Sequence, residues 1–128
     1  MTLLLDTHVL LWAVVSPEKL SGKLRARLDS PREEICYSTA SLWEIAIKST
    51  LGRTDFSVDV AALRRGLLEH GYREVPISGS HAIALRHLPH LHKDPFDRML
   101  IAQAQAESVV LLTHDAQVAR YPGPIELV

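Results

Sequence analysis

The sequence has only one cysteine, Cys36, among its 128 residues, so no internal disulfide can form. Disulfides are rare in reducing compartments, and we therefore expect a cytoplasmic protein. No apolar run approaches the roughly 18 residues that a membrane span requires. The apolar N-terminal stretch lacks a basic segment and is interrupted by Asp6 and His8, which is not the pattern of a signal peptide. These absences argue against a secreted disulfide-rich scaffold and against a membrane protein.

An excess of basic charge is also missing, because 14 Lys and Arg residues face 15 Asp and Glu residues, for a net charge of −1. The composition as a whole thus gives no basic footprint for nucleic acid, although a local basic patch can coexist with an acidic site. Hydrophobic residues make up 47% and charged residues 23%, which is typical of a folded globular protein. The length fits one domain spanning residues 1–128.

Short apolar segments alternate with amphipathic segments along the chain, separated by Gly, Pro and Ser. The predicted strands cover residues 3–5, 35–37, 74–77, 109–112 and 125–128. The predicted helices cover residues 7–15, 17–28, 38–51, 58–70, 80–88 and 95–107, with a short helix after Asp115. This alternation predicts an α/β fold, a three-layer α/β/α sandwich with a mainly parallel central sheet.

Two acids stand just after predicted strands. Asp6 follows the strand at 3–5, and Asp115 follows the strand at 109–112 after two intervening residues. Either residue alone has a simple alternative interpretation as a helix N-cap. If both strands are central and parallel, however, the two carboxylates meet at the edge of the sheet where open parallel sheets bind ligands.

Glu44 lies in the segment ASLWEIAIK, which is apolar on nearly every side and therefore predicts a buried helix. A buried carboxylate needs a partner, because an unpaired charge is costly to remove from water. Three partners are open: a capping box with Ser41, an ion pair with Lys48 four residues later, or a metal ion.

Asp97 lies in the segment HKDPFDRMLIAQA, which predicts a helix beginning at Pro95. Asp94 precedes the proline and is the expected N-cap. Asp97 then falls in the first helical turn, where the helix dipole alone would favour an acid. It also shares a face with Ile101 and Ala104, so we expect its carboxylate to point toward the sheet rather than into water.

Four carboxylates at one edge of a sheet would repel one another. Two like charges about 4 Å apart repel by roughly 4 kcal/mol at an effective dielectric constant of about 20. Such a cluster needs cations or must retain protons. An all-oxygen set of ligands favours Mg²⁺ or Mn²⁺, and these ions can activate water and stabilise the leaving oxygen of a phosphodiester. We therefore interpret the four acids as catalytic metal ligands: Asp6, Glu44, Asp97 and Asp115.

The motifs LLLDTHVLLW, SLWEIAIK, HKDPFDRMLIAQA and LLTHD resemble those of the PIN-domain ribonucleases, and above all the VapC-type toxins of bacterial toxin–antitoxin pairs. The resemblance covers essentially the whole chain, in the order of the family. It implies an α/β/α sandwich, endoribonuclease activity dependent on Mg²⁺ or Mn²⁺, an RNA substrate, a homodimer, and a small antitoxin that inserts into the active site. It assigns the four acids to Asp6, Glu44, Asp97 and Asp115, with Asp94 as the competitor for the third, and it matches Thr113 to a frequent hydroxyl residue.

Seven histidines invite a zinc interpretation. His87, His90 and His92 cluster, but Pro89 interrupts them, and neither a CxxC nor an HExxH motif accompanies them. We therefore do not expect a zinc site. His8 and His114 flank two of the acids and are expected to pack at the rim of the site.

Lys48 and Arg98 neighbour the proposed acids in sequence and are the best candidates for phosphate contacts. Three other functions compete with the ribonuclease hypothesis. A receiver-like signalling domain would need paired acids after the first strand and a lysine after the last, which the sequence lacks. A non-catalytic binding module disagrees with the presence of all four acids, whereas a nuclease acting on DNA stays open.

Overall fold

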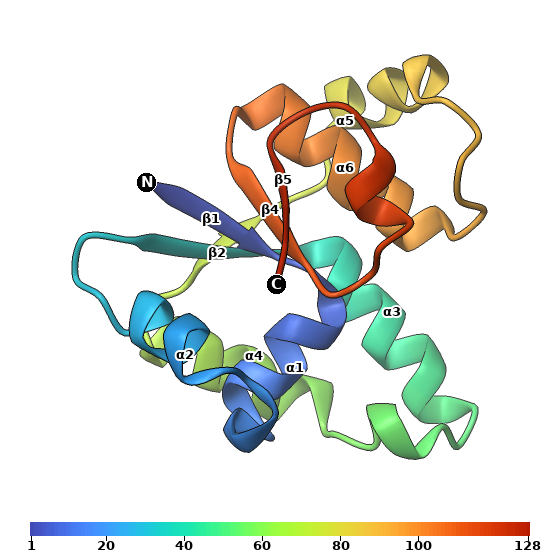
Figure 1. Cartoon of the computed structure of the whole chain (residues 1–128). Coiled ribbons are helices and arrows are strands. Elements are labelled where there is room, and N and C mark those ends of the chain that lie inside the picture. The colour runs from blue at the N-terminus through green and yellow to red at the C-terminus, as the bar shows by residue number, and fades with distance from the viewer.

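A five-stranded sheet forms the centre of the computed structural model, which describes residues 1–128 (Figure 1). The strand order is β3-β2-β1-β4-β5, and every neighbouring pair is parallel. The strands are β1 (Thr2–Leu5), β2 (Glu34–Ser38), β3 (Arg73–Val75), β4 (Val110–Thr113) and β5 (Ile125–Leu127). The predicted α/β class with a parallel sheet is confirmed.

Six α-helices and four 3-10 turns connect the strands. The helices are α1 (Thr7–Val14), α2 (Gly22–Leu28), α3 (Thr39–Thr50), α4 (Val60–Glu69), α5 (Gly79–Ala84) and α6 (Pro95–Glu107). The 3-10 turns are η1 (Pro17–Lys19), η2 (Thr54–Phe56), η3 (Leu85–His87) and η4 (Val118–Arg120). None of the helices is long and apolar enough to cross a membrane.

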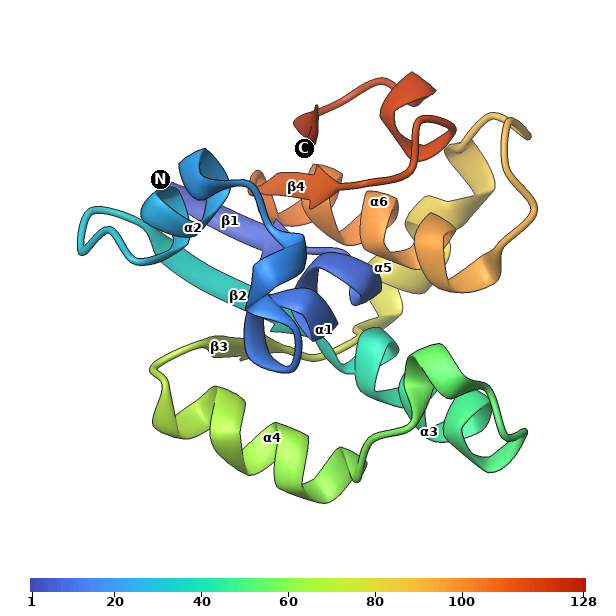
Figure 2. The same ribbon diagram turned by 60° about the horizontal axis from the view of Figure 1, so that its bottom comes forward.

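The sheet separates two hydrophobic cores, because alternate residues of a strand face opposite sides. In β1, Leu3 and Leu5 pack into the core shared with α1, α2 and α4, whereas Leu4 packs into the core shared with α6. Figure 1 shows α1, α2 and α4 on one side of the sheet and α5 and α6 on the other. The turned view in Figure 2 shows α3 running outward from the carboxyl end of β2.

Two predicted helices differ from the structure. The segment 17–28 is not one helix: it forms η1, an extended residue at Leu20, and then α2, whose N-cap Ser21 accepts a hydrogen bond from the Leu24 backbone N–H. The spacing of the leucines misled the prediction, because it reflects their shared burial rather than a continuous helix. The predicted helix after Asp115 is only the short turn η4, since two prolines follow within four residues of it.

The strand order places a topological switch point at the middle of the sheet. The chain moves outward from β1 to β2 and β3, then returns to β4 on the opposite side of β1 and continues to β5. In open parallel sheets the crevice at such a reversal, beyond the carboxyl ends of the strands, is the usual ligand site. Asp6 directly follows β1, and Asp115 lies two residues after β4.

Candidate active site

A cavity of about 530 Å³ opens at this switch point, and all four predicted acids line it. The complete lining consists of Asp6, His8, Trp12, Glu44, Lys48, His92, Asp94, Asp97, His114, Asp115 and Ala116. Acids from α1, α3, α6 and the segment after β4 therefore meet in one place. Their assignment as catalytic and metal-binding groups remains a prediction.

Asp6 is both a helix cap and a wall of the cavity. Its Oδ1 accepts a hydrogen bond from the Val9 backbone N–H at 2.8 Å, which caps α1. Its Oδ2 accepts hydrogen bonds from the Thr113 hydroxyl at 2.7 Å and from the His114 backbone N–H at 3.1 Å. The N-cap interpretation is thus correct, and it does not exclude a role in the site.

Thr113 links the acid after β1 to the acid after β4. While its hydroxyl donates to Asp6, the same oxygen accepts a hydrogen bond from the Asp115 backbone N–H at 3.0 Å. Asp115 is the most exposed of the four acids, with 41% of its side chain accessible. Its Oδ1 accepts a hydrogen bond from the Gln117 backbone N–H, and its Oδ2 lies 3.4 Å from His92 Nε2.

Glu44 is almost fully buried on α3. Its Oε2 forms the predicted ion pair with Lys48, whereas its Oε1 is buried without any hydrogen-bond partner. The capping box with Ser41 is wrong, because Ser38 is the N-cap of α3 and Ser41 lies inside the helix. Lys48 therefore accounts for one carboxylate oxygen, and the other has no partner within the chain.

Asp97 lies in the first turn of α6, above the buried Ile101 and Ala104 as predicted. Burial, together with the nearby negative charges of Asp94, Glu44 and Asp6, raises the pKa of the Asp97 carboxyl to about 7, although a hydrogen bond from His92 opposes this shift. The carboxyl is thus only partly ionised near neutral pH when no cation is present. The cavity holds more negative charge than the chain compensates.

Asp94 is the N-cap of α6, as predicted, and its Oδ1 accepts hydrogen bonds from the backbone N–H groups of Phe96 at 2.8 Å and Asp97 at 3.0 Å. Asp94 also lines the cavity, so position alone does not separate it from Asp97. Its Oδ1 caps the helix, whereas the Asp97 carboxylate accepts no backbone hydrogen bond and lies 2.8 Å from His92 Nε2. The choice of Asp97 over Asp94 as the third acid stays a prediction.

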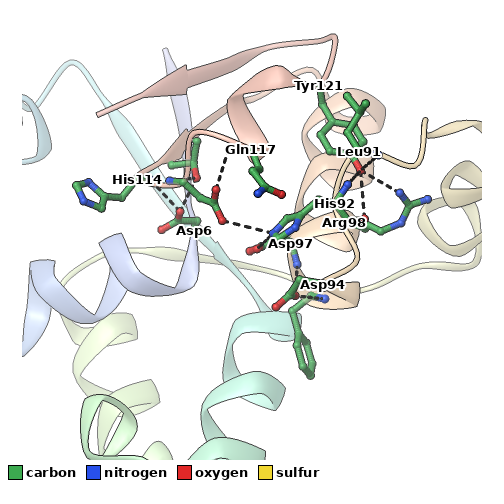
Figure 3. Close-up of polar contacts among 12 residues, drawn as sticks. Asp6, Leu91, His92, Asp94, Asp97, Arg98, His114, Gln117 and Tyr121 are labelled. Atoms are coloured by element: carbon green, nitrogen blue, oxygen red, sulfur yellow. Dashed lines mark hydrogen bonds and ion pairs between the residues drawn. The ribbon is translucent and has the colours of Figure 1, made fainter.

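His92 is part of the site, although the sequence did not predict it. Its Nε2 lies 2.8 Å from Asp97 Oδ2 and 3.4 Å from Asp115 Oδ2, and Figure 3 shows its ring directed at Asp97. The only signal was its place five residues before Asp97 in the same motif. In the sequence His92 was considered only as a member of a three-histidine zinc site, which Pro89 argued against, and not as a single residue beside Asp97. His87 and His90 are exposed and lie outside the cavity lining.

Tyr121 holds the segment that carries His92. Its hydroxyl accepts hydrogen bonds from the backbone N–H groups of Leu91 at 3.2 Å and His92 at 2.9 Å, and from the Arg98 guanidinium at 3.0 Å (Figure 3). Arg98 also donates to the Pro89 carbonyl at 2.9 Å. Arg98, a candidate for phosphate contact, has its guanidinium engaged in bracing this segment and does not line the cavity.

An aromatic group forms the opposite rim of the cavity. The ring of the half-buried Trp12 lies 4.8 Å from that of His114 and 6.0 Å from that of His8, measured between centroids. His114 Nδ1 lies 3.0 Å from the Val128 carbonyl oxygen. The expectation that both histidines pack at the rim of the site is confirmed.

The fold and the cavity together define an α/β domain that gathers carboxylates at the switch point of a parallel sheet. The chain belongs to the PIN-domain family, whose model matches residues 3–124. It is 30% identical over 127 residues to Ribonuclease VapC22 of Mycobacterium tuberculosis (strain ATCC 25618 / H37Rv), and the match covers 97% of this chain and 96% of that protein. Membership of this family rules out a receiver domain.

Solved structures of VapBC proteins share the fold. VapBC2 from Rickettsia felis, bound to a DNA fragment from its promoter, matches with a TM-score of 0.74 at 17% identity and covers 99% of this chain and 98% of that one. DNA-bound VapBC from Salmonella typhimurium matches with a TM-score of 0.68 at 21% identity, covering 98% and 97%. VapBC-1 from nontypeable Haemophilus influenzae matches with a TM-score of 0.64 at 16% identity, and the match covers 94% of this chain and 91% of that one.

Proposed function

We propose that this PIN domain is an endoribonuclease that hydrolyses RNA phosphodiester bonds with Mg²⁺ or Mn²⁺. The observation that carries the proposal is the meeting of four carboxylates, contributed by distant parts of the sequence, in one cavity at the switch point. The relative that is 30% identical is named a ribonuclease, which supports RNA as the substrate.

The residues of the cavity fit a hard divalent cation. The orphaned Oε1 of Glu44 and the raised pKa of Asp97 both mark negative charge that lacks a counterion. Carboxylate oxygens are the ligands that Mg²⁺ and Mn²⁺ prefer. Asp6, Asp97 and Asp115 would hold the ion, and Glu44 would complete the site directly or through water. A bound ion would supply an activated water and stabilise the leaving oxygen of the phosphodiester.

The other residues of the cavity serve the same reaction. Lys48 carries the only Lys or Arg side chain in the lining, so it is the group that would contact a phosphate. Its ammonium lies 4.7 Å from the centroid of the Phe56 ring, at the distance of a cation–π contact. Thr113 fixes Asp6 and the backbone of Asp115 relative to one another. This preorganisation would keep the acids in place during the reaction.

The biological setting that we propose is a toxin–antitoxin pair. The structural neighbours are named VapBC proteins, and this supports a small antitoxin as the partner of the chain and a toxin as its role. We also propose a homodimer and a cytoplasmic location, in agreement with the resemblance and the single cysteine.

Cleavage of a labelled single-stranded RNA by the purified protein tests the proposal, with Mg²⁺, Mn²⁺ or EDTA added in parallel. We expect cleavage with either ion and none in EDTA. Asp115→Asn should be inactive. The matched control Asp59→Asn should be fully active, because Asp59 caps α4 and does not line the cavity, and Asn also caps. Cleavage that persists in EDTA would refute the metal dependence. Cleavage of a DNA strand of the same sequence, with RNA left intact, would favour the DNA alternative.

A further inference from the structure

His92 occupies the space between two of the proposed metal ligands. Its Nε2 and one oxygen each from Asp97 and Asp115 all lie within 4.8 Å of one another. The individual separations from Nε2 are 2.8 Å to Asp97 Oδ2 and 3.4 Å to Asp115 Oδ2. One imidazole nitrogen therefore faces two carboxylates that come from different elements.

The backbone holds His92 there independently of the two acids. Tyr121 accepts hydrogen bonds from the N–H groups of His92 and Leu91, and Arg98 fixes the preceding carbonyl of Pro89. Tyr121 itself is buried, with 4% of its surface exposed. The backbone hydrogen bonds of this segment therefore position the imidazole in the cavity, in addition to its contacts with the two carboxylates.

The spacing of these three atoms matches the coordination sphere of a small cation. In an octahedral site with bonds of about 2.1 Å, adjacent ligand atoms lie about 3.0 Å apart and opposite ones about 4.2 Å apart. The two separations from His92 Nε2, 2.8 Å and 3.4 Å, lie on either side of the adjacent value. The two carboxylate oxygens are at most 4.8 Å apart, which is close to the distance between opposite ligands. A fourth donor, Glu44 Oε1, is buried on the same cavity without a partner.

We propose that His92 is a nitrogen ligand of the cation in this site, so that the site binds transition-metal ions in preference to Mg²⁺. The inference rests on the proposed function in one respect, namely that a cation binds among the acids. Imidazole is a poor ligand for Mg²⁺ and a good one for first-row transition ions, and affinity rises from Mn²⁺ toward Zn²⁺. Mn²⁺ is then the better of the two expected ions, and Zn²⁺ binds more tightly still.

Pulsed electron paramagnetic resonance on the full chain loaded with Mn²⁺ tests this assignment, because a directly bound nitrogen-14 nucleus gives a measurable hyperfine coupling. We expect the coupling in the wild-type protein and in His90→Ala, and its loss in His92→Ala. His90 is the matched control, since it is exposed in the same segment and does not line the cavity. In titrations, His92→Ala should weaken Mn²⁺ binding at least about tenfold and Mg²⁺ binding by no more than about threefold.

The outcomes separate this proposal from the one on which it rests. Bound Mn²⁺ without nitrogen coupling in the wild-type protein would overturn the role of His92 and leave the carboxylate site intact. Coupling that survives in His92→Ala would assign the nitrogen to another histidine and would also overturn it. Failure of the wild-type protein to bind Mn²⁺ would overturn this inference, and failure to bind Mg²⁺ as well would refute the proposed function.

Discussion

At the scale of single residues, the raised pKa of Asp97 is the clearest effect of the excess negative charge in the site. Asp97 combines burial with three acidic neighbours, so its folded state keeps a proton that the unfolded chain would release. The sequence allowed the four acids to be predicted, because each follows a strand or shares a face with apolar residues. It did not allow His92 to be predicted, because only the folding of the segment before α6 brings that ring beside Asp97.

The raised pKa of Asp97 makes the stability of the metal-free protein depend on pH. Between the unfolded pKa of about 4 and the folded pKa of about 7, the folded state binds more protons than the unfolded state. The free energy of unfolding therefore falls as the pH rises through this range. In EDTA, we expect the melting temperature of the wild type to drop several degrees more than that of Asp97→Asn between pH 5 and pH 7.5. Parallel curves for the two proteins would contradict this.

Asp94 and Asp97 should respond differently to the same substitution. Asp94→Ser should stay active and nearly as stable, because serine also caps a helix, and even a lost cap costs only about 1 kcal/mol. Asp97→Ser should fold and yet cleave RNA in Mg²⁺ slower by orders of magnitude, because a metal ligand is missing. Melting temperature and cleavage rate, measured on both variants, decide the matter. An inactive Asp94→Ser beside an active Asp97→Ser would show that the third acid is assigned to the wrong residue.

At the scale of elements, α6 and the segment before it illustrate what local signals reveal. The Asp94-Pro95 pair predicts the start of α6 correctly, because capping and proline geometry are local. The anchoring of Leu91 and His92 by Tyr121 is a contact between residues about 30 positions apart, and no local pattern encodes it. The spacing of Leu20, Leu24 and Leu28 likewise predicted correctly that the three side chains are buried, but it predicted wrongly that they lie on one continuous helix.

Removal of the Tyr121 hydroxyl should loosen this segment without disturbing the sheet. Tyr121→Phe leaves two backbone N–H groups without their acceptor and removes one hydrogen bond of Arg98, at a cost of about 1–2 kcal/mol in the free energy of unfolding. We expect faster amide hydrogen exchange at Leu91 and His92 together with a lower urea midpoint. Tyr72→Phe is the matched control, because the Tyr72 hydroxyl makes no hydrogen bond to the protein. Equal exchange rates in the two variants would refute the anchoring role.

At the scale of the whole molecule, the parallel sheet and its order follow from strands that alternate with helices, and the family resemblance covers nearly the entire chain. The sequence predicted that the acids meet at one edge of the sheet, on the condition that the strands before Asp6 and Asp115 are central and parallel. The parallel pairing of β4 with β1 fulfils that condition, and the four acids line one cavity.

A cation that binds only the folded cavity should stabilise the whole molecule. The gain is RT ln(1 + [L]/Kd), about 2.7 kcal/mol at a hundredfold excess over Kd, which corresponds to several degrees in melting temperature. We expect millimolar Mn²⁺ to produce this shift in the wild type and in Asp59→Asn, and a much smaller one in Asp115→Asn. Absence of any shift with either Mn²⁺ or Mg²⁺ would count against the site.

The hydrogen bond between Asp6 and Thr113 joins residues 107 positions apart. During synthesis Asp6 therefore leaves the ribosome before Thr113 does, by about 5 to 20 s at elongation rates of about 5–20 residues per second. In that interval the nascent chain has the first acid but neither β4 nor Asp115, so it cannot assemble the cavity. A message broken before the codons for this last segment would yield a polypeptide without the cavity, so the activity that we propose can arise only once translation is nearly complete.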